Sequence, residues 1–90
     1  MQTRGILVSG KVQGVFFRKH ASTAAKNFGL SGFVQNTSDG NVYIEVTGSE
    51  IAINEMINWC YKGSPASQVE NVIPLNLNLK EFEGFRILYV

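Results

Sequence analysis

The ninety-residue sequence predicts an α+β fold, from two observations. The hydrophobic period changes repeatedly between two residues, which is typical of strands, and about 3.6 residues, which is typical of helices. The elements follow the order strand, helix, strand, strand, helix, strand, with a short last strand. This order (βαββαβ) predicts a ferredoxin-like split βαβ fold, in which two helices cover one face of an antiparallel sheet. Residues 1–90 are expected to form a single domain, because a second domain would have too little core of its own.

The first strand is expected at residues 4–10, "RGILVSG", where β-branched and aliphatic residues end at a glycine. A helix is expected between Val15 and Phe28, because apolar residues recur there on one helix face. The residues of this face are Phe17, Ala21, Ala24, Ala25 and Phe28. Gly29 stands where a left-handed residue closes a helix, and Leu30 can pack back against the last turn.

A hairpin is predicted between residues 31 and 48. "SGFVQNT" (31–37) and "VYIEVTG" (42–48) have the composition of strands, and "SDGN" (38–41) contains an Asp-Gly turn signal. In the later strand Val42, Ile44 and Val46 alternate with Tyr43, Glu45 and Thr47. This alternation predicts a strand that is buried on one face and exposed on the other.

The second helix is expected to begin after Ser49, which can cap it, with Glu50 in the first turn where a negative charge is favourable. Gly63 is expected to end it, and "SPAS" (64–67) is expected to be a loop. Its apolar residues keep helical spacing, and they are Ile53, Met56, Ile57 and Cys60.

Two strands are expected in the last part of the chain, at residues 68–75, "QVENVIPL", and 85–90, "FRILYV". Pro74 predicts that the earlier one is irregular or lies at a sheet edge. The alternating "LNLNL" at 75–79 is compatible with a strand with one apolar face, and whether it is an edge strand stays open. Charged residues follow it and would oppose aggregation at an edge.

The composition excludes several classes of protein. No apolar run has the length of a membrane span, and the N-terminus has the pattern of neither a signal nor a transit peptide, so the expected location is the cytoplasm. Cys60 is the only cysteine and His20 the only histidine, so no internal disulfide, metal site or cofactor is predicted.

The charges are unevenly distributed, although the net charge is only +1. Residues 1–38 carry five basic side chains and no acidic one, whereas the rest of the chain carries three basic and seven acidic side chains. A site built from the first half would therefore have a positive field that suits a small anion. Lys19 and Lys26 are individually expected to be solvated surface charges. The basic excess is smaller than nucleic-acid binding usually requires.

The segment Gly10–Arg18, "GKVQGVFFR", lies between the first strand and the first helix. Backbone N–H groups at a helix start lack intrahelical partners and readily bind anions. Gly14 allows close approach of a ligand, and Arg18 can add a bidentate contact to phosphate oxygens. The spacing matches neither the nucleotide P-loop nor the dinucleotide-binding motif. From spacing alone, a glycine-containing loop with a surface arginine is the slightly favoured interpretation.

This segment resembles the signature of the acylphosphatases, G-x-V-Q-G-V-x-F-R. Its fixed places are filled by Gly10, Val12, Gln13, Gly14, Val15, Phe17 and Arg18. A second stretch resembles another motif of the family, which is matched by Gly32, Phe33, Val34, Asn36, Gly40, Val42 and Gly48. "WCYKGSP" and "FRIL" extend the likeness over nearly the whole chain. The departures are Phe33 in place of a common tryptophan, Tyr43 in place of a frequent glutamate, and Ser64 and Ser67 in place of a frequent proline and alanine.

The resemblance implies an enzyme that hydrolyses acyl phosphates to carboxylate and phosphate without a metal. Arg18 would bind the phosphoryl group together with loop N–H groups, and Asn36 would orient the attacking water. The loop residues concerned are Gln13, Gly14, Val15, Phe16, Phe17 and Arg18. The implied partner is a small-molecule acyl phosphate, with phosphate as product and competitive inhibitor. No nucleic-acid or membrane partner is expected, and the chain is expected to be a monomer.

Other interpretations remain at this stage. Asn36 stands among typical turn residues and would pass for one without the motif. The fold class also includes RNA-binding modules, for which Phe33 and Tyr43 are the available stacking aromatics. A third hypothesis is a phosphate-binding domain without activity, of the kind that is fused to larger proteins. No fused partner is expected here, which favours a free-standing enzyme. His20, two residues beyond Arg18, is expected to face solvent or the rim of the site. The phenylalanines, Phe16 among them, are expected to be core or loop anchors.

Overall fold

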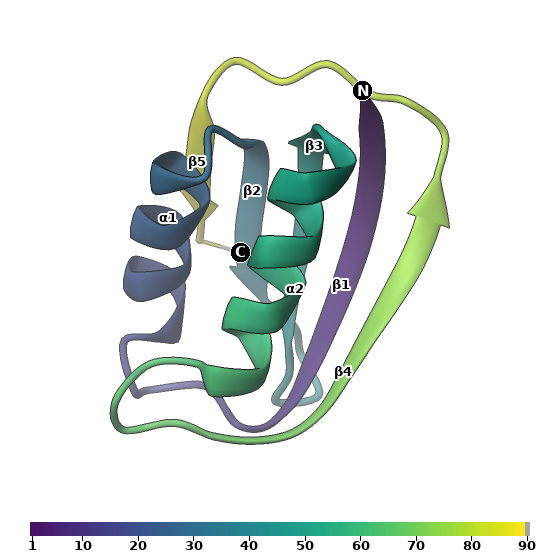
Figure 1. Cartoon of the computed structure of the whole chain (residues 1–90). Coiled ribbons are helices and arrows are strands. Elements are labelled where there is room, and N and C mark those ends of the chain that lie inside the picture. The colour runs from purple at the N-terminus through teal and green to yellow at the C-terminus, as the bar shows by residue number, and fades with distance from the viewer. Residues whose placement is uncertain (90) are drawn as a thin grey trace.

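The computed structural model describes residues 1–89 and contains a five-stranded sheet with two helices on one face (Figure 1). In chain order the elements are β1 (Gln2–Lys11), α1 (Phe17–Asn27), β2 (Ser31–Asn36), β3 (Val42–Gly48), α2 (Glu50–Lys62), β4 (Gln68–Leu77) and β5 (Phe85–Leu88). The predicted ferredoxin-like fold class is confirmed. Val90, which the predicted last strand included, lies outside the described residues.

The strand order in the sheet is β4-β1-β3-β2-β5. Three of its pairings are antiparallel, as predicted, whereas the pairing of β2 with β5 is parallel. Since β1 and β2 both run antiparallel to β3, and β5 runs parallel to β2, these three strands share one direction. Their carboxyl ends therefore meet at the same end of the sheet.

Helix α1 begins at Phe17, two residues later than the hydrophobic spacing predicts, because Phe16 adopts a left-handed conformation with φ 58°. Its end follows the prediction. Gly29 has φ 75° and donates to the Lys26 carbonyl, while Leu30 donates to the Ala25 carbonyl at 2.9 Å. This pair of hydrogen bonds is a Schellman motif, which satisfies carbonyls that a helix end otherwise leaves without partners.

Helix α2 has the predicted caps at both ends. The Ser49 hydroxyl accepts a hydrogen bond from the Ala52 N–H at 3.1 Å, and Gly63 follows the last turn with φ 70°. Its apolar stripe, including the fully buried Cys60, packs onto the sheet beside α1. Neither helix of the described residues has the length and hydrophobicity that a bilayer crossing requires.

The core lies between the helices and the sheet. On β3 the side chains of Val42, Ile44 and Val46 are completely buried, as the alternation predicts. The opposite face of β3 is not open as predicted, because Glu45 and Thr47 are buried too. The segment between β4 and β5 crosses the end of the sheet at which the N-terminus lies (Figure 1). In this segment, the Lys80 ammonium pairs with Glu45 and the Lys80 carbonyl accepts a hydrogen bond from the Thr47 hydroxyl.

Strand β4 forms one edge of the sheet, which confirms the edge position that Pro74 predicts. Residues 75–77 of the "LNLNL" stretch are the last residues of this strand, and residues 78–79 lie beyond it. At the other edge, β5 is a short strand of four residues.

Candidate active site

A cavity of about 570 Å³ opens at the end of the sheet where β1, β2 and β5 finish. The loop that follows β1 (the 12–16 loop), the last residue of β2 and the residue after β5 all reach it. The residues that line it are Val12, Gly14, Phe16, Phe17, Arg18, Lys19, Asn36, Ile87 and Tyr89. Three segments that are distant in sequence thus form one site because their strands run in the same direction.

The 12–16 loop has an unusual backbone conformation. Gly14 has φ 73°, and Phe16 has φ 58°, which makes Phe16 the one non-glycine residue with positive φ within residues 1–89. A left-handed conformation costs an L-residue about 1–2 kcal/mol, so the surrounding contacts must hold it. Val12 and Val15 supply part of this anchoring, since both side chains are buried in the core. Turns of this kind orient successive backbone N–H groups toward a common point, where an anion can bind.

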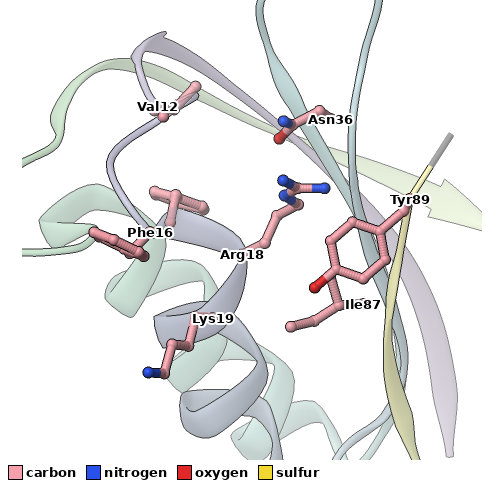
Figure 2. A pocket seen from close by; sticks show the side chains of 9 residues that line it. Val12, Phe16, Arg18, Lys19, Asn36, Ile87 and Tyr89 are labelled. Atoms are coloured by element: carbon pink, nitrogen blue, oxygen red, sulfur yellow. The ribbon is translucent and has the colours of Figure 1, made fainter.

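Arg18 is the second residue of α1, and its guanidinium occupies the middle of the cavity, between Asn36 and Tyr89 (Figure 2). Its central carbon lies 4.8 Å from the centre of the Tyr89 ring, within the range of a cation–π contact. No acidic side chain within residues 1–89 forms an ion pair with it. The guanidinium therefore contacts an aromatic ring on one side, and no acidic side chain of the described residues competes with an anion for its N–H donors.

Asn36 is the last residue of β2, paired with Val42 of β3. Its side chain points into the cavity toward Arg18 (Figure 2). The Oδ1 atom of this side chain is buried and has no hydrogen-bond partner among the described residues. A buried acceptor without a protein partner is costly to the fold unless a water molecule or a ligand supplies the hydrogen bond.

The Gln13 side chain joins the 12–16 loop to the β2–β3 hairpin. Its Nε2 donates to the carbonyl of Thr37 at 2.8 Å and to that of Asn41 at 2.7 Å. Thr37 follows Asn36 directly, so these two hydrogen bonds connect the loop to the strand end that carries Asn36. The relative position of the two halves of the cavity is thereby constrained.

The structure brings together most of the residues that the sequence predicts for the site. Gly14, Phe16, Phe17, Arg18 and Asn36 all line the cavity, whereas Gln13 and Val15 do not. The Gln13 amide instead binds the hairpin, and the Val15 side chain is part of the core.

Four cavity residues were missing from the sequence prediction: Val12, Lys19, Ile87 and Tyr89. Lys19 is exposed as expected but lies at the cavity rim. Ile87 and Tyr89 reach the cavity because β5 lies parallel beside β2. The signal for Ile87 and Tyr89 in the sequence was the closing "FRIL" strand, but the sequence did not reveal which strand pairs with it.

Other expectations have mixed outcomes. The prediction that Phe16 is an anchor is wrong, because its side chain is 73% exposed on a left-handed backbone that turns the ring outward. Phe17, by contrast, is buried against Trp59. His20 is exposed and does not line the cavity. Burial raises the pKa of the Cys60 thiol to about 12, which makes it a poor nucleophile.

The chemistry of the lining is cationic and hydrogen-bonding. Arg18 and Lys19 supply positive charge, and Asn36 supplies an amide, while the lining contains no Asp, Glu, His or Cys. Within residues 1–89 no three such side chains are grouped closely enough to hold a metal ion. This arrangement can bind a small anion and orient a polar molecule beside it.

The sequence and the fold match known proteins closely. The acylphosphatase family model matches residues 4–87. An acylphosphatase of Alkalilimnicola ehrlichii is 41% identical over 97% of this chain and 98% of its own. The crystal structure of an acylphosphatase from Bacillus subtilis superposes with a TM-score of 0.95 at 34% identity, covering 99% of this chain and 100% of that one. The chain belongs to the acylphosphatase family. An acylphosphatase from Coxiella burnetii agrees, with a TM-score of 0.93 at 33% identity over 97% of this chain and 92% of its own.

Membership of the acylphosphatase family confirms the predicted class of enzyme, a hydrolase. None of the departures from the family pattern is at Arg18 or Asn36, and none lines the cavity. Phe33 and Tyr43 pack together on the sheet face away from the helices, where the Tyr43 hydroxyl donates to the buried Glu45. A carboxylate at that place disfavours the RNA-binding alternative. Ser64 is buried and contacts the 12–16 loop.

Proposed function

We propose that this chain hydrolyses the carboxyl-phosphate bond of acyl phosphates, and that Arg18 and Asn36 have different roles in the reaction. Arg18 and the backbone N–H groups of residues 13–18 bind the phosphoryl group. Asn36 orients the water that attacks it. The supporting observation is that Arg18 and Asn36 line one cavity, in which the Asn36 Oδ1 atom is buried without a partner.

The phosphoryl group fits the cationic part of the cavity. A guanidinium presents paired N–H donors that match two phosphate oxygens, and the loop N–H groups can contact the remaining oxygen. As the phosphoryl group transfers, negative charge is spread over these equatorial oxygens. Donors that are already fixed in place stabilise that charge without reorganisation, and they supply the main part of the rate enhancement.

The attacking water is held by Asn36. An amide is neutral near physiological pH, so Asn36 cannot act as a base, but its Oδ1 can accept a hydrogen bond from water. A water held there approaches phosphorus on the side opposite the acyl oxygen. Its oxygen forms the new P–O bond while the P–O bond to the acyl group breaks, and its proton passes to a phosphoryl oxygen of the substrate.

The leaving group needs no assistance from the protein. The acyl oxygen departs with the bonding electron pair as a carboxylate, which is stable without protonation near neutral pH. The reaction therefore requires neither a general acid nor a metal ion, in keeping with a lining that contains no Asp, Glu, His or Cys. Positioning and charge stabilisation are sufficient for such an activated substrate.

The direct test is the release of benzoate and phosphate from benzoyl phosphate by the purified chain without added metal and with a chelator present. We expect turnover well above the solvent rate, and competitive inhibition by inorganic phosphate. A folded protein that gives no rate above solvent would refute the proposed activity. Inhibition by the chelator would refute the metal-independent mechanism alone.

A further inference from the structure

The 12–16 loop has a buried hydrogen bond to the turn that follows α2. The Ser64 hydroxyl donates to the Val15 carbonyl at 2.8 Å, and Ser64 is only 2% exposed. A proline, which is frequent in the family at this place, has neither a hydroxyl nor any other donor. A chain with proline at this place would lack the contact.

The Val15 carbonyl belongs to the same peptide unit as the N–H group of Phe16. No peptide bond of the described chain is cis, so this carbonyl and this N–H point in opposite directions. Ser64 does not line the Arg18 cavity but a separate hollow, together with His20 and Trp59. A hydrogen bond that holds the carbonyl toward Ser64 consequently directs the Phe16 N–H away from Ser64, and Phe16 is one of the residues that line the Arg18 cavity.

The same peptide unit leads into the strained residue of the loop. Phe16 has φ 58°, and such a conformation persists only where surrounding contacts fix it. Its own ring contributes little, because it is 73% exposed. The buried Val15 side chain and the Ser64 hydrogen bond thus help to fix the peptide preceding Phe16.

The turn that carries Ser64 is itself well constrained. The Ser64 carbonyl accepts from the Ser67 N–H at 3.0 Å and from the Ser67 hydroxyl at 2.7 Å. A side chain at Gly63 would lie within 2.3 Å of the Ser67 hydroxyl, so the chain is tightly packed there. Ser64 therefore meets the loop from a turn that has little freedom to move.

We propose that Ser64 is a positioning residue of the phosphate-binding loop, whose hydroxyl orients the Phe16 N–H toward the bound phosphoryl group. This inference rests on the proposed function, since it assigns a role to the same loop. Ser64 acts through the Val15–Phe16 peptide and does not itself touch the substrate.

The test compares Ser64→Ala with the wild-type chain in direct binding of inorganic phosphate by calorimetry. Loss of one well-placed hydrogen-bond donor to phosphate corresponds to about 1.4 kcal/mol, so we expect about tenfold weaker binding. The matched control is Ser67→Ala, which removes a hydroxyl from the same turn but leaves its backbone hydrogen bond to Ser64. For this control we expect less than a twofold change. Ser64→Cys keeps nearly the same volume with a weaker donor, and should also weaken binding if Ser64→Ala does not fold.

A spectroscopic measurement separates positioning from a purely structural role. On addition of phosphate, the Phe16 amide proton of the wild-type chain should move downfield, as a proton donated to an anion does. In Ser64→Ala this shift should fall to less than half, while the indole proton of Trp59 should be unchanged between the two proteins. Thermal unfolding of each variant shows whether binding is measured on folded protein.

The outcomes distinguish this inference from the proposed function. If wild-type protein is inactive on benzoyl phosphate but binds phosphate, and Ser64→Ala weakens that binding, the activity is wrong and the role of Ser64 stands. If Ser64→Ala lowers only the unfolding temperature, with phosphate affinity and the Phe16 shift as in Ser67→Ala, the role of Ser64 is overturned. A wild-type chain that binds no phosphate would overturn it as well.

Discussion

Glu45 and Asn36 lie on neighbouring strands, and both bring buried polar oxygens to the sheet, but their surroundings differ. Both oxygens of Glu45 have partners, since Oε1 accepts from the Lys80 ammonium at 2.9 Å and Oε2 from the Tyr43 hydroxyl at 2.7 Å. The Oδ1 of Asn36 has none among the described residues. Nearby, Phe16 adopts a strained conformation, and Arg18 has no acidic partner within residues 1–89.

Polar groups that satisfy one another contribute to the stability of the fold, whereas a buried group without a partner reduces it unless a water molecule or a ligand supplies the hydrogen bond. The proposed function assigns that role to the attacking water at Asn36. The region around Glu45 is therefore expected to respond to mutation mainly through stability. The region around Asn36 and Arg18 is expected to respond mainly through activity.

Arg18→Ala should have the largest effect on the reaction. Removal of the guanidinium takes away the main positive charge that faces the phosphoryl group, and we expect a loss of roughly 10³-fold or more in kcat/KM. Stability should change by less than about 1 kcal/mol, because an exposed cation–π contact such as that with Tyr89 contributes little. Steady-state kinetics and urea unfolding measure the two quantities.

Arg18→Lys is the informative companion variant, because it keeps the charge but loses the planar pair of donors. We expect it to remain severely impaired. Near-normal kcat/KM in Arg18→Lys would show that charge alone is sufficient and would contradict the bidentate role.

Glu45→Ala should have the converse effect. It leaves the Tyr43 hydroxyl and the Lys80 ammonium without their shared acceptor, and we expect a loss of about 2 kcal/mol in the free energy of unfolding. The kcat of the folded protein should be unchanged. Glu81→Ala, at an exposed position of the same segment as Lys80, is the control and should alter stability by less than about 0.5 kcal/mol. A large loss of kcat in folded Glu45→Ala would contradict the expectation that this region affects stability rather than activity.

Positions 14 and 16 should both prefer glycine to alanine by about 1 kcal/mol, because both have left-handed φ values. A Cβ at Gly14 would meet no atom within 4 Å, so Gly14→Ala reports the backbone cost alone. At position 16, comparison of Phe16→Gly with Phe16→Ala isolates the same cost after removal of the exposed ring. Urea unfolding of the three variants measures it, and equal stability of the glycine and alanine variants at position 16 would argue against strain there.

The smallest effect concerns stability at alkaline pH. Burial raises the pKa of Cys60 from 9.0 to about 12, and burial together with the Glu45 carboxylate raises the pKa of Tyr43 from 10.0 to about 12. Both groups lose protons in the unfolded chain before they do so in the folded one, so stability is unaffected below pH 9 and falls as pH rises from 9 toward 12. Chemical unfolding at several pH values should show this decline, and Cys60→Ala should make it shallower between pH 9 and 10. An unchanged slope in that variant would mean that the Cys60 pKa is not raised.

The sequence predicts the fold well because its signals are local and agree with one another. The cap at Ser49, the Schellman closure at Gly29 and the alternation of Val42, Ile44 and Val46 all appear in the structure as predicted. The errors concern contacts between distant segments. The burial of Glu45 depends on Lys80, which lies 35 residues later, and no local pattern indicates it.

The candidate site shows the same limit. Gly14, Arg18 and Asn36 could be identified from two motifs, each within a short stretch. The place of Tyr89 beside Arg18 depends on β5 pairing in parallel with β2, which hydrophobic patterning does not specify. The left-handed conformation of Phe16 was also unpredictable, because the tertiary contacts of Val15 override the ordinary preference of a bulky residue.

Asn36→Ala separates the two proposed roles, binding of the phosphoryl group by Arg18 and positioning of the water by Asn36. The measurement is kcat on benzoyl phosphate together with the affinity for inorganic phosphate, on the same folded preparation beside the wild-type chain. We predict a loss of roughly 10²-fold or more in kcat, with phosphate affinity within about threefold of wild type, a difference of less than 0.7 kcal/mol. An Asn36→Ala protein that keeps most of its kcat, or that loses phosphate binding in parallel with turnover, would contradict the account.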